Sequence, residues 1–494
     1  MTGSLPAPEW FAAAPTWLED APLFQAWRRF VDADLAPFTI PGHKRRGHRL
    51  DPDLGRLLAA DVPLYGGLDT MKLTGGVLAD AQHRAAALWG ADLCRFSTGG
   101  STQANLAIVL ALGRPGDQVL VARNAHRSVL SGLVLAGLRP VWLPVRIDPA
   151  TGGPSGLEVA EVRDALAAHP DAVALLCTEP SYQGTLSDLP ALVSMAHRRG
   201  VPVVVDQAWG AHLGLAPGYP PHALAMGADA MITSAHKALP AISGGSLLLA
   251  RTERLDAARI DRAFEATHTT SPPGAVLASI DAARALLASP TGTAALGALR
   301  ALVAAAREQL RAAGLHVTGP DEHPAGRFDP AKVVIRFATS GRSGLVAEQC
   351  LLAADVPVEM ADRDTLVAQF GLLDDADTVA RLVGGVLATL TGPSGPPRAP
   401  MAAGPPLPPI VVAPRAAFFA EYETVARTAS IGRVAAELVA PYPPGVPLIV
   451  PGELITGPTL AALDAALAAG NRIAYAADPT LATLQVIAGE VLDC

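Results

Sequence analysis

Short apolar runs alternate with amphipathic stretches from about residue 84 to residue 250 of this chain. Nearly every residue in each run is apolar, which is typical of strands that a sheet buries on both faces. The stretches between the runs have the apolar spacing of helices, and residues 189–200 end on Gly200, a common residue just after a helix. The alternation predicts a mostly parallel sheet between layers of helices. The predicted strands are residues 117–123, 139–145, 172–180, 201–208, 228–235 and 244–250.

A second α/β unit is expected after this sheet. Residues 294–315 have the pattern of a long alanine-rich helix, 332–337 that of a strand, and 346–360 that of a helix followed by a strand. Residues 391–414 are too rich in proline for packed helix or sheet, which predicts a linker or an extended strap. The predicted division is an N-terminal segment (1–50), a large domain (51–290), a small α/β domain (291–390), a linker (391–414) and a small C-terminal domain (415–494).

The composition excludes several classes of function. A net charge of −8 argues against a protein that binds the phosphate backbone of nucleic acids. The four cysteines, Cys94, Cys177, Cys350 and Cys494, are widely spaced, which argues against zinc or disulfide scaffolds and favours a reducing compartment. The N-terminus lacks the pattern of a signal peptide, and no apolar run approaches a membrane span. A cytoplasmic protein with no membrane partner and no bound metal is expected.

Polar residues follow four of the apolar runs, at the edge of an open parallel sheet where ligands bind. The turn 97–107, "STGGSTQANLA", leads into a helix and offers N–H and hydroxyl donors for a phosphate. His126 and Asp206 follow two further runs, and Lys237 follows a fourth. A cap, a turn or an internal salt bridge would explain any one of these residues. Together they predict pyridoxal phosphate, which needs a lysine for its aldehyde, a carboxylate for its pyridine nitrogen and donors for its phosphate.

Several longer motifs occur in one order along most of the chain. They are "PGHKRRG" (41–47), "STGGSTQAN" (97–105), "RNAHRSV" (123–129), "TEPSYQGTLSDL" (178–189), "VDQAWGAH" (205–212), "TSAHK" (233–237), "TTSPPGAVLASIDAAR" (269–284) and "PYPPGVPLIVPGE" (441–453). With these motifs the sequence resembles the ornithine/lysine/arginine decarboxylase family of fold-type I pyridoxal-phosphate enzymes, in a short form without the N-terminal wing domain. The resemblance implies an aspartate-aminotransferase-like fold, with a mostly parallel central sheet in the large domain, and a homodimer or higher homo-oligomer with active sites at the interface. It also implies a role in polyamine biosynthesis.

The resemblance also implies a role for each matching residue. Lys237 would hold the cofactor covalently, and Asp206 would pair with its pyridine nitrogen. His126 would stack on one face of the ring, and Ala208 would lie against the other. The remaining expected contacts are Ser101, Thr102, Ser234 and His236 for the phosphate, Ser181 near the 3′-oxygen, Thr269 and Ser271 for the phosphate of the neighbouring subunit, and the block around Glu453 at the substrate entrance.

The implied reaction is decarboxylation of an amino acid, with a basic substrate such as lysine, ornithine or arginine, to an amine and CO2. Lys237, Asp206, His126 and His236 are its expected catalytic residues. Burial and a cationic His236 would both lower the pKa of Lys237, so that it can act as an amine.

Two stretches depart from the family pattern. One is "TSPPGAV" (270–276), which lacks an aromatic residue, and the other is "GGLDTMKLTGG" (66–76). In the second, Asp69 is kept while Thr70 and Lys72 replace an acid and a histidine. These changes bear on the substrate more than on the cofactor. The candidate acids for a basic side chain are Asp69, Glu179 and Glu359.

Three alternatives remain open from the sequence. An aminotransferase or an aldolase could use the same fold and the same lysine. An aminotransferase would need an arginine that grips the α-carboxylate, and Arg336 in the predicted strand 332–337 could supply it. A cofactor-binding regulator without turnover is the third alternative, against which the intact Lys237 argues.

Overall fold

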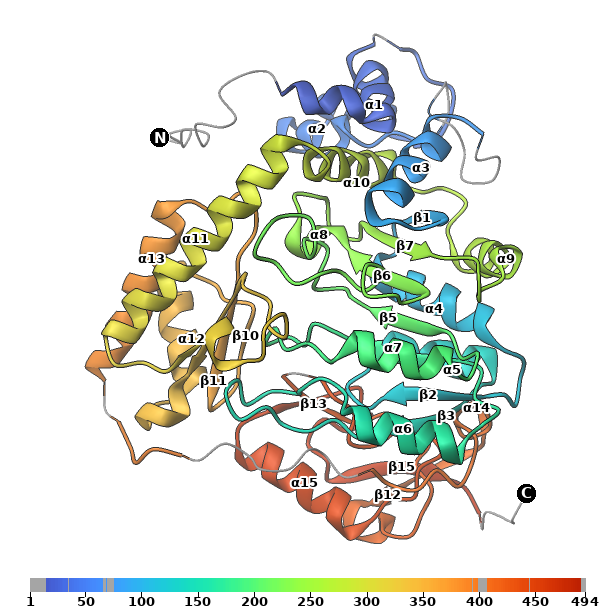
Figure 1. Ribbon diagram of the computed structural model, residues 1–494, viewed down its shortest axis with the longest axis vertical. Coiled ribbons are helices and arrows are strands. Elements are labelled where there is room, and N and C mark those ends of the chain that lie inside the picture. The colour runs from blue at the N-terminus through green and yellow to red at the C-terminus, as the bar shows by residue number, and fades with distance from the viewer. Residues whose placement is uncertain are drawn as a thin grey trace.

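The computed structural model describes residues 15–33, 35–64, 68, 75–392, 394–398, 407–443 and 445–489 (Figure 1). Asp69, Thr70 and Lys72 lie outside the described residues.

The centre of the molecule is a mixed sheet which, in the part of the chain described, has seven strands in the order β1-β7-β6-β5-β4-β2-β3. Strands β2 to β6 pair in parallel, and β7 is antiparallel to both of its neighbours. The mostly parallel α/β sheet is therefore confirmed, and each of the six predicted runs contains one strand. The strands are β1 (Leu93–Ser97), β2 (Gln118–Ala122), β3 (Arg139–Leu143), β4 (Leu175–Thr178), β5 (Val203–Asp206), β6 (Ala230–Ser234) and β7 (Ser246–Ala250).

Alternate residues of the central strands belong to two different apolar cores. Val203 and Val205 of β5 lie in one core, and Val204 between them lies in the other. Successive side chains of a strand point to opposite faces, so an all-apolar run needs helices on both sides. One face is covered by α4 (Gly100–Leu112), α5 (Arg127–Ala136) and α9 (Ala257–Thr267), and the other by α3 (Val77–Trp89), α6 (Val159–Ala168), α7 (Leu189–His197) and α10 (Gly274–Leu287).

A second, antiparallel sheet has the order β10-β11-β9-β8 among the described residues. The predicted helix 294–315 corresponds to the long α11, which packs against α13, and the predicted strand 332–337 corresponds to β9. This unit forms the yellow and orange layer beside the central sheet (Figure 1). Its elements are α11 (Pro290–Ala312), β8 (Val317–Thr318), β9 (Lys332–Arg336), α12 (Gly344–Ala353), β10 (Met360–Ala361), β11 (Thr365–Gln369) and α13 (Ala376–Ala388).

The C-terminal unit has a small apolar core of its own, which includes Ile449, Leu463 and Val486. It lies next to β2 and β3 of the central sheet (Figure 1). Its elements are α14 (Pro414–Phe419), β12 (Tyr422–Ala426), β13 (Ala440–Tyr442), α15 (Gly457–Ala468), β14 (Arg472–Ala474) and β15 (Thr483–Ile487). At the other end of the chain are α1 (Pro22–Asp32) and α2 (Pro52–Ala59). The exact domain boundaries given above stay a prediction.

A buried ion pair joins the C-terminal unit to the central sheet. The Nη2 atom of Arg123, just after β2, lies 3.0 Å from Oε2 of Glu453, and its Nε donates to the carbonyl oxygen of Pro447 at 3.0 Å. Both side chains of the pair are almost completely buried. Glu453 itself therefore fixes the docking of the C-terminal unit, while Gly445 and Val446 of the block around it lie in the wall of the cavity described below.

Across the described ranges, no single helix is long and apolar enough to cross a membrane, although α10 and α11 meet those criteria as a pair bent by 83°.

Candidate active site

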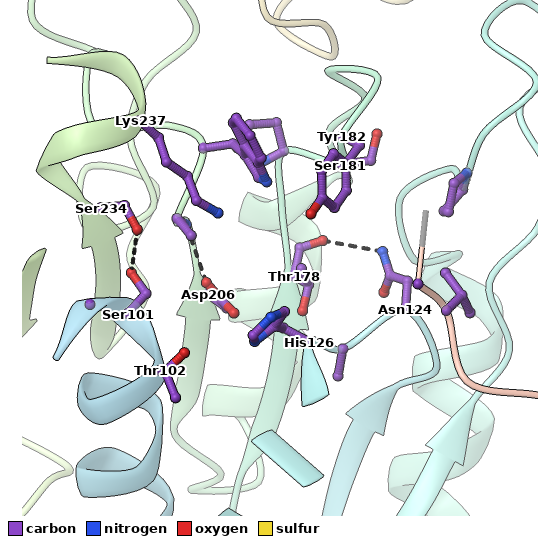
Figure 2. Close-up of a pocket in the computed structure, with 18 of the residues that line it drawn as sticks. Ser101, Thr102, Asn124, His126, Thr178, Ser181, Tyr182, Asp206, Ser234 and Lys237 are labelled. Carbon is purple, nitrogen blue, oxygen red and sulfur yellow. Dashed lines mark hydrogen bonds between the residues drawn. The ribbon is translucent and has the colours of Figure 1, made fainter. Parts of the chain in front are cut away.

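A cavity of about 290 Å³ opens at the carboxyl ends of the parallel strands (Figure 2). The ends of strands and the loops that follow six strands form its wall, together with one loop of the C-terminal unit. Its position agrees with the rule that open α/β sheets bind ligands at this edge. The lining residues are Gly99–Thr102 after β1, Asn124–His126 after β2, Pro154 after β3, Thr178 and Pro180–Gln183 at and after the end of β4, Asp206, Ala208 and Trp209 at and after the end of β5, Ser234, His236, Lys237 and Gly244 at and after the end of β6, and Gly445 and Val446 of the C-terminal unit.

One end of the cavity carries the hydroxyl groups that the sequence assigns to a phosphate. Helix α4 begins at this wall with Gly100, whose N–H donates to the carbonyl oxygen of Gly244 at 2.8 Å, and the N–H groups of Ser101 and Thr102 follow in the same first turn, where a helix can bind an anion. The hydroxyl of Ser101 on α4 lies 2.8 Å from that of Ser234 at the end of β6 (Figure 2). Thr102 and His236 lie in the same wall, with Nδ1 of His236 donating to the carbonyl oxygen of Gly245 at 2.9 Å. The four predicted phosphate residues are thus brought together.

The floor of the cavity is a network around Asp206. One carboxylate oxygen of Asp206 accepts a hydrogen bond from Nδ2 of Asn105 at 2.8 Å, and the other accepts from the backbone N–H of Ala208 at 3.2 Å. Asn105 also donates to the hydroxyl of Ser128 at 3.0 Å. Asn105 stands one helical turn after Ser101 on α4, so both residues project from the same face. The sequence motif contained Asn105, but only the fold shows that it orients the buried acid.

His126 is both a helix cap and part of the cavity wall. It is the N-cap residue of α5, and its Nδ1 lies 2.7 Å from the hydroxyl of Ser128. Burial lowers the pKa of His126, the carboxylate of Asp206 opposes that change, and the Lys237 cation adds to it. A neutral imidazole that is held in place through the contacts of its Nδ1 atom can stack on a flat, charged ligand.

Lys237 extends from the short helix α8 (Ala235–Ala238) toward Asp206 and His126 (Figure 2). Its Nζ lies 4.0 Å from the centre of the Trp209 ring. Burial lowers the pKa of Lys237, while the carboxylates of Asp206 and Glu359 oppose the change. The predicted lowering is therefore explained by burial, and His236, which was also expected to contribute, is not among its causes.

The loop after β4 supplies the predicted Ser181 and an aromatic residue that the sequence did not single out. The hydroxyl of Ser181 lies 2.6 Å from that of Thr185 and accepts from the Thr185 N–H at 3.1 Å. Tyr182 packs on Trp209 with ring centres 4.9 Å apart. An indole directly after Ala208 in the motif 205–212 was the available signal for this aromatic wall.

Two further predicted residues lie elsewhere in a single chain. Thr269 and Ser271 are exposed and interact with each other, with their hydroxyls 3.4 Å apart. They do not line the cavity of their own chain, and their role toward a neighbouring subunit stays a prediction.

The candidate acids occupy different environments. Glu179 is buried outside the cavity wall, where it accepts from the N–H of Ser187 at 2.9 Å and where burial raises its pKa. Glu359, just before β10, is open to solvent at a position from which it interacts with both Lys237 and Lys332. Neither acid lines this cavity, and of the two only Glu359 is exposed.

Arg336 is not placed to grip a substrate carboxylate. It is 2% exposed, and its guanidinium packs so closely on Gly152 that an added Cβ there would lie 1.3 Å from Nη1. The carboxylates of Asp148, Asp362 and Asp364 surround it, and it does not line the cavity. This placement argues against the aminotransferase alternative. Within the described ranges, no group of three or more histidine, cysteine or acidic side chains could hold a metal ion.

Family models match most of the chain. The model described as the major domain of Orn/Lys/Arg decarboxylase matches residues 21–320, and the model of the C-terminal domain of the same enzymes matches residues 405–473. The chain belongs to the Orn/Lys/Arg decarboxylase family. This membership confirms the expectations that the chain is a decarboxylase and that its cofactor is pyridoxal phosphate.

Several members of the decarboxylase family align over nearly their full length. The chain is 34% identical to an arginine decarboxylase of Halalkalibacterium halodurans, over 95% of this chain and 98% of that protein. It is 30% identical to an arginine decarboxylase of Bacillus subtilis, again over 95% and 98%. Among solved structures, the lysine decarboxylase LdcF of Francisella novicida superposes with a TM-score of 0.81 at 19% identity, covering 94% of this chain and 80% of that one. The constitutive lysine decarboxylase of E. coli gives 0.80 at 21% identity, with coverage of 95% and 82%.

The cavity of this decarboxylase-family chain fits the cofactor at each of its functional groups. The hydroxyls of Ser101 and Ser234 and the start of α4 provide donors for a phosphate. Asp206 is a buried carboxylate held by Asn105 and Ala208, as a pyridine nitrogen requires. Lys237 provides an amine within the same cavity. These three features together are the chemistry that pyridoxal phosphate needs.

Proposed function

We propose that this chain decarboxylates a basic amino acid, with arginine as the first candidate, and that Lys237 holds the cofactor covalently. The observation that carries the proposal is that the Lys237 amine and the Asp206 carboxylate line one cavity with the paired hydroxyls of Ser101 and Ser234. The relatives at 30–34% identity that are called arginine decarboxylases support arginine over lysine and ornithine. The product would be the corresponding amine, for which polyamine biosynthesis is the proposed pathway.

Asp206 has a defined electrostatic role in the proposed reaction. When bound, the cofactor ring accepts the electron pair that carboxylate loss leaves at the substrate Cα. Asp206 keeps a proton at the ring nitrogen, and the donor contacts from Asn105 and Ala208 hold its carboxylate in place. Because these groups are fixed before the reaction, they stabilise the transition state without reorganising.

Lys237 alternates between an amine and an acid. Burial lowers its pKa, so it can exist as the neutral amine that a covalent link requires. After the substrate amine displaces it, Lys237 can carry the proton that must be returned to Cα. His236 lies in the same wall and is the second candidate proton donor.

The substrate side chain would extend toward the small domain. Glu359 interacts with Tyr182 of the cavity wall and with Tyr442 of the C-terminal unit, and in each tyrosine burial is the main factor that raises the pKa. A carboxylate beside two aromatic rings suits a guanidinium or an ammonium group. We propose Glu359 as the partner of that cation.

The proposal extends to assembly and location. We propose a cytoplasmic homodimer in which Thr269 and Ser271 contact the phosphate in the neighbouring subunit. Their exposed hydroxyls in the single chain support this arrangement.

A substrate panel tests the proposal. CO2 release from arginine, lysine and ornithine would be measured with added pyridoxal phosphate, and each amine would be identified by its mass. We expect release from arginine to be fastest. Amine transfer that depends on a keto acid, without CO2, would indicate an aminotransferase, and a protein that binds the cofactor but is inert toward the whole panel would be a regulator.

A further inference from the structure

A buried serine connects two cavity residues that have separate roles in the mechanism above. Ser128, in the first turn of α5, is 1% exposed and does not line the cavity. Its hydroxyl oxygen lies 2.7 Å from Nδ1 of His126 and 3.0 Å from Nδ2 of Asn105. The same Nδ2 lies 2.8 Å from Oδ2 of Asp206. A chain of hydrogen bonds therefore joins the Asp206 carboxylate to the His126 imidazole, and Ser128 is the link without an assigned role.

The direction of these bonds is fixed at the Asp206 end. A carboxylate only accepts hydrogen bonds, so Asn105 must turn its amino group, and not its carbonyl oxygen, toward Asp206. The same amino group donates its other proton to the hydroxyl oxygen of Ser128. Ser128 thus accepts from Asn105, and its own hydroxyl proton remains for a different partner.

The backbone fixes the direction at the His126 end. His126 is the N-cap residue of α5, and its Nδ1 accepts a hydrogen bond from the backbone N–H of Ser128 at 3.3 Å. A backbone N–H only donates, so Nδ1 presents a lone pair and carries no proton. The Ser128 hydroxyl consequently donates to the same Nδ1. The two ends of the chain of bonds require one and the same placement of protons.

This placement selects one form of the imidazole. A neutral histidine whose Nδ1 carries no proton has its proton on Nε2. Within the described ranges, the hydrogen bonds of the His126 ring all use Nδ1, and the ring lies beside Asp206 in the cavity wall (Figure 2). The proton is therefore on the side of the ring away from Ser128.

Charged groups on three elements act on this ring. Burial lowers the pKa of His126; Asp206 at the end of β5 opposes the change, and Lys237 on α8 and Arg127 on α5 add to it. A cationic ring would need a second proton at Nδ1, where both donors of Ser128 already point. A neutral ring adds no positive charge beside the pyridine nitrogen that Asp206 would keep protonated.

We propose that Ser128 is a positioning residue that holds His126 in the tautomer protonated at Nε2 and joins this ring, through Asn105, to Asp206. The proposal rests on the function proposed above, because that function assigns to His126 the stacking contact with the cofactor ring. Ser128 itself lies behind the cavity wall and touches neither cofactor nor substrate.

NMR can show which nitrogen of His126 carries the proton. Full-length protein labelled with 15N in its histidine side chains would be titrated between pH 5 and pH 8, with and without pyridoxal phosphate, and the His126 signals would be identified by their loss in His126→Gln. At pH 7 we expect an unprotonated Nδ1 and a protonated Nε2 in the wild-type protein. Ser128→Ala removes a donor that stabilises the neutral ring, so the midpoint of His126 protonation should rise by about half to one pH unit. Ser131→Ala, the same change at an exposed position of α5, should keep the wild-type midpoint.

A purely structural role would lower the melting temperature of the Ser128→Ala protein and leave the tautomer and the midpoint unchanged, and this result would overturn the proposal. A wild-type His126 with its proton on Nδ1 would overturn it as well. If Ser128→Ala does not fold, Ser128→Cys replaces it; its thiol is a weaker donor, so a smaller upward shift is expected, and an unmoved midpoint again contradicts the proposal. The signals can be read without turnover. A wild-type protein with the expected tautomer that neither binds the cofactor nor releases CO2 would therefore contradict the proposed function alone.

Discussion

The two ends of the cavity are built in different ways. At the cofactor end, residues of the central sheet hold one another through short, direct hydrogen bonds, such as those from Asn105 to Asp206 and between Ser101 and Ser234. At the proposed substrate end, Glu359 of the small domain and Tyr442 of the C-terminal unit lie outside the lining of the cavity, interact electrostatically and are exposed. A fixed set of cofactor contacts can be kept in enzymes that act on different substrates. Substrate contacts that come from three separate units can change without disturbing the cofactor contacts.

The largest effect at the cofactor end of the cavity is expected for Asp206→Asn. Without a carboxylate the ring nitrogen loses its proton, so kcat should fall on the order of 10²- to 10³-fold. The KM should change little, and the cofactor should still bind through Lys237. Steady-state kinetics and the visible spectrum check both points, and a variant with wild-type kcat would refute the role of Asp206.

Ser234→Ala should weaken cofactor binding at the same end of the cavity and leave the catalytic step unchanged. Its hydroxyl is a proposed donor to the phosphate, and a lost hydrogen bond to a charged group costs about 1.5 to 3 kcal/mol. The Kd for pyridoxal phosphate should rise at least about tenfold, with kcat at saturating cofactor nearly unchanged. Ser131→Ala, on the exposed face of α5, is the matched control. Equal Kd values for the two variants would remove Ser234 from the phosphate site.

Glu359→Gln would change the substrate end alone. Because Glu359 is exposed, its interaction with a substrate cation is screened and is worth about 1 kcal/mol at most. The KM for arginine should rise about three- to fivefold, while kcat and the cofactor spectrum stay the same. Asp355→Asn, an exposed acid in the same segment, provides the control. A KM that rises equally in both variants would show that general charge, and not Glu359, attracts the substrate.

The same contrast explains how far the sequence could predict the site. The cofactor end was predictable because its residues end or follow apolar runs in continuous motifs, as Ser234 ends β6 and Lys237 follows it. Lys332 lay inside a predicted strand and gave no signal, since Trp209, whose ring its amine contacts, stands far away in the sequence. The ion pair of Glu453 gave no signal for the same reason, since its partner Arg123 is separated from it by 330 positions.

The candidate acids show the same limit. Glu179 and Glu359 both stand next to apolar runs, and only the fold distinguishes the buried acid that bonds to Ser187 from the exposed acid near Lys237. Sequence motifs therefore predicted the chemistry of this protein better than its choice of substrate.

The central claim is that Lys237, and not its buried neighbour Lys332, holds the cofactor. Borohydride reduction of the wild-type protein loaded with pyridoxal phosphate, followed by peptide mass analysis, tests the claim directly. The account predicts a single reduced adduct on Lys237, and a Lys237→Ala variant with neither visible absorbance nor turnover. An adduct on Lys332, or a Lys237→Ala protein that remains yellow and active, would contradict it.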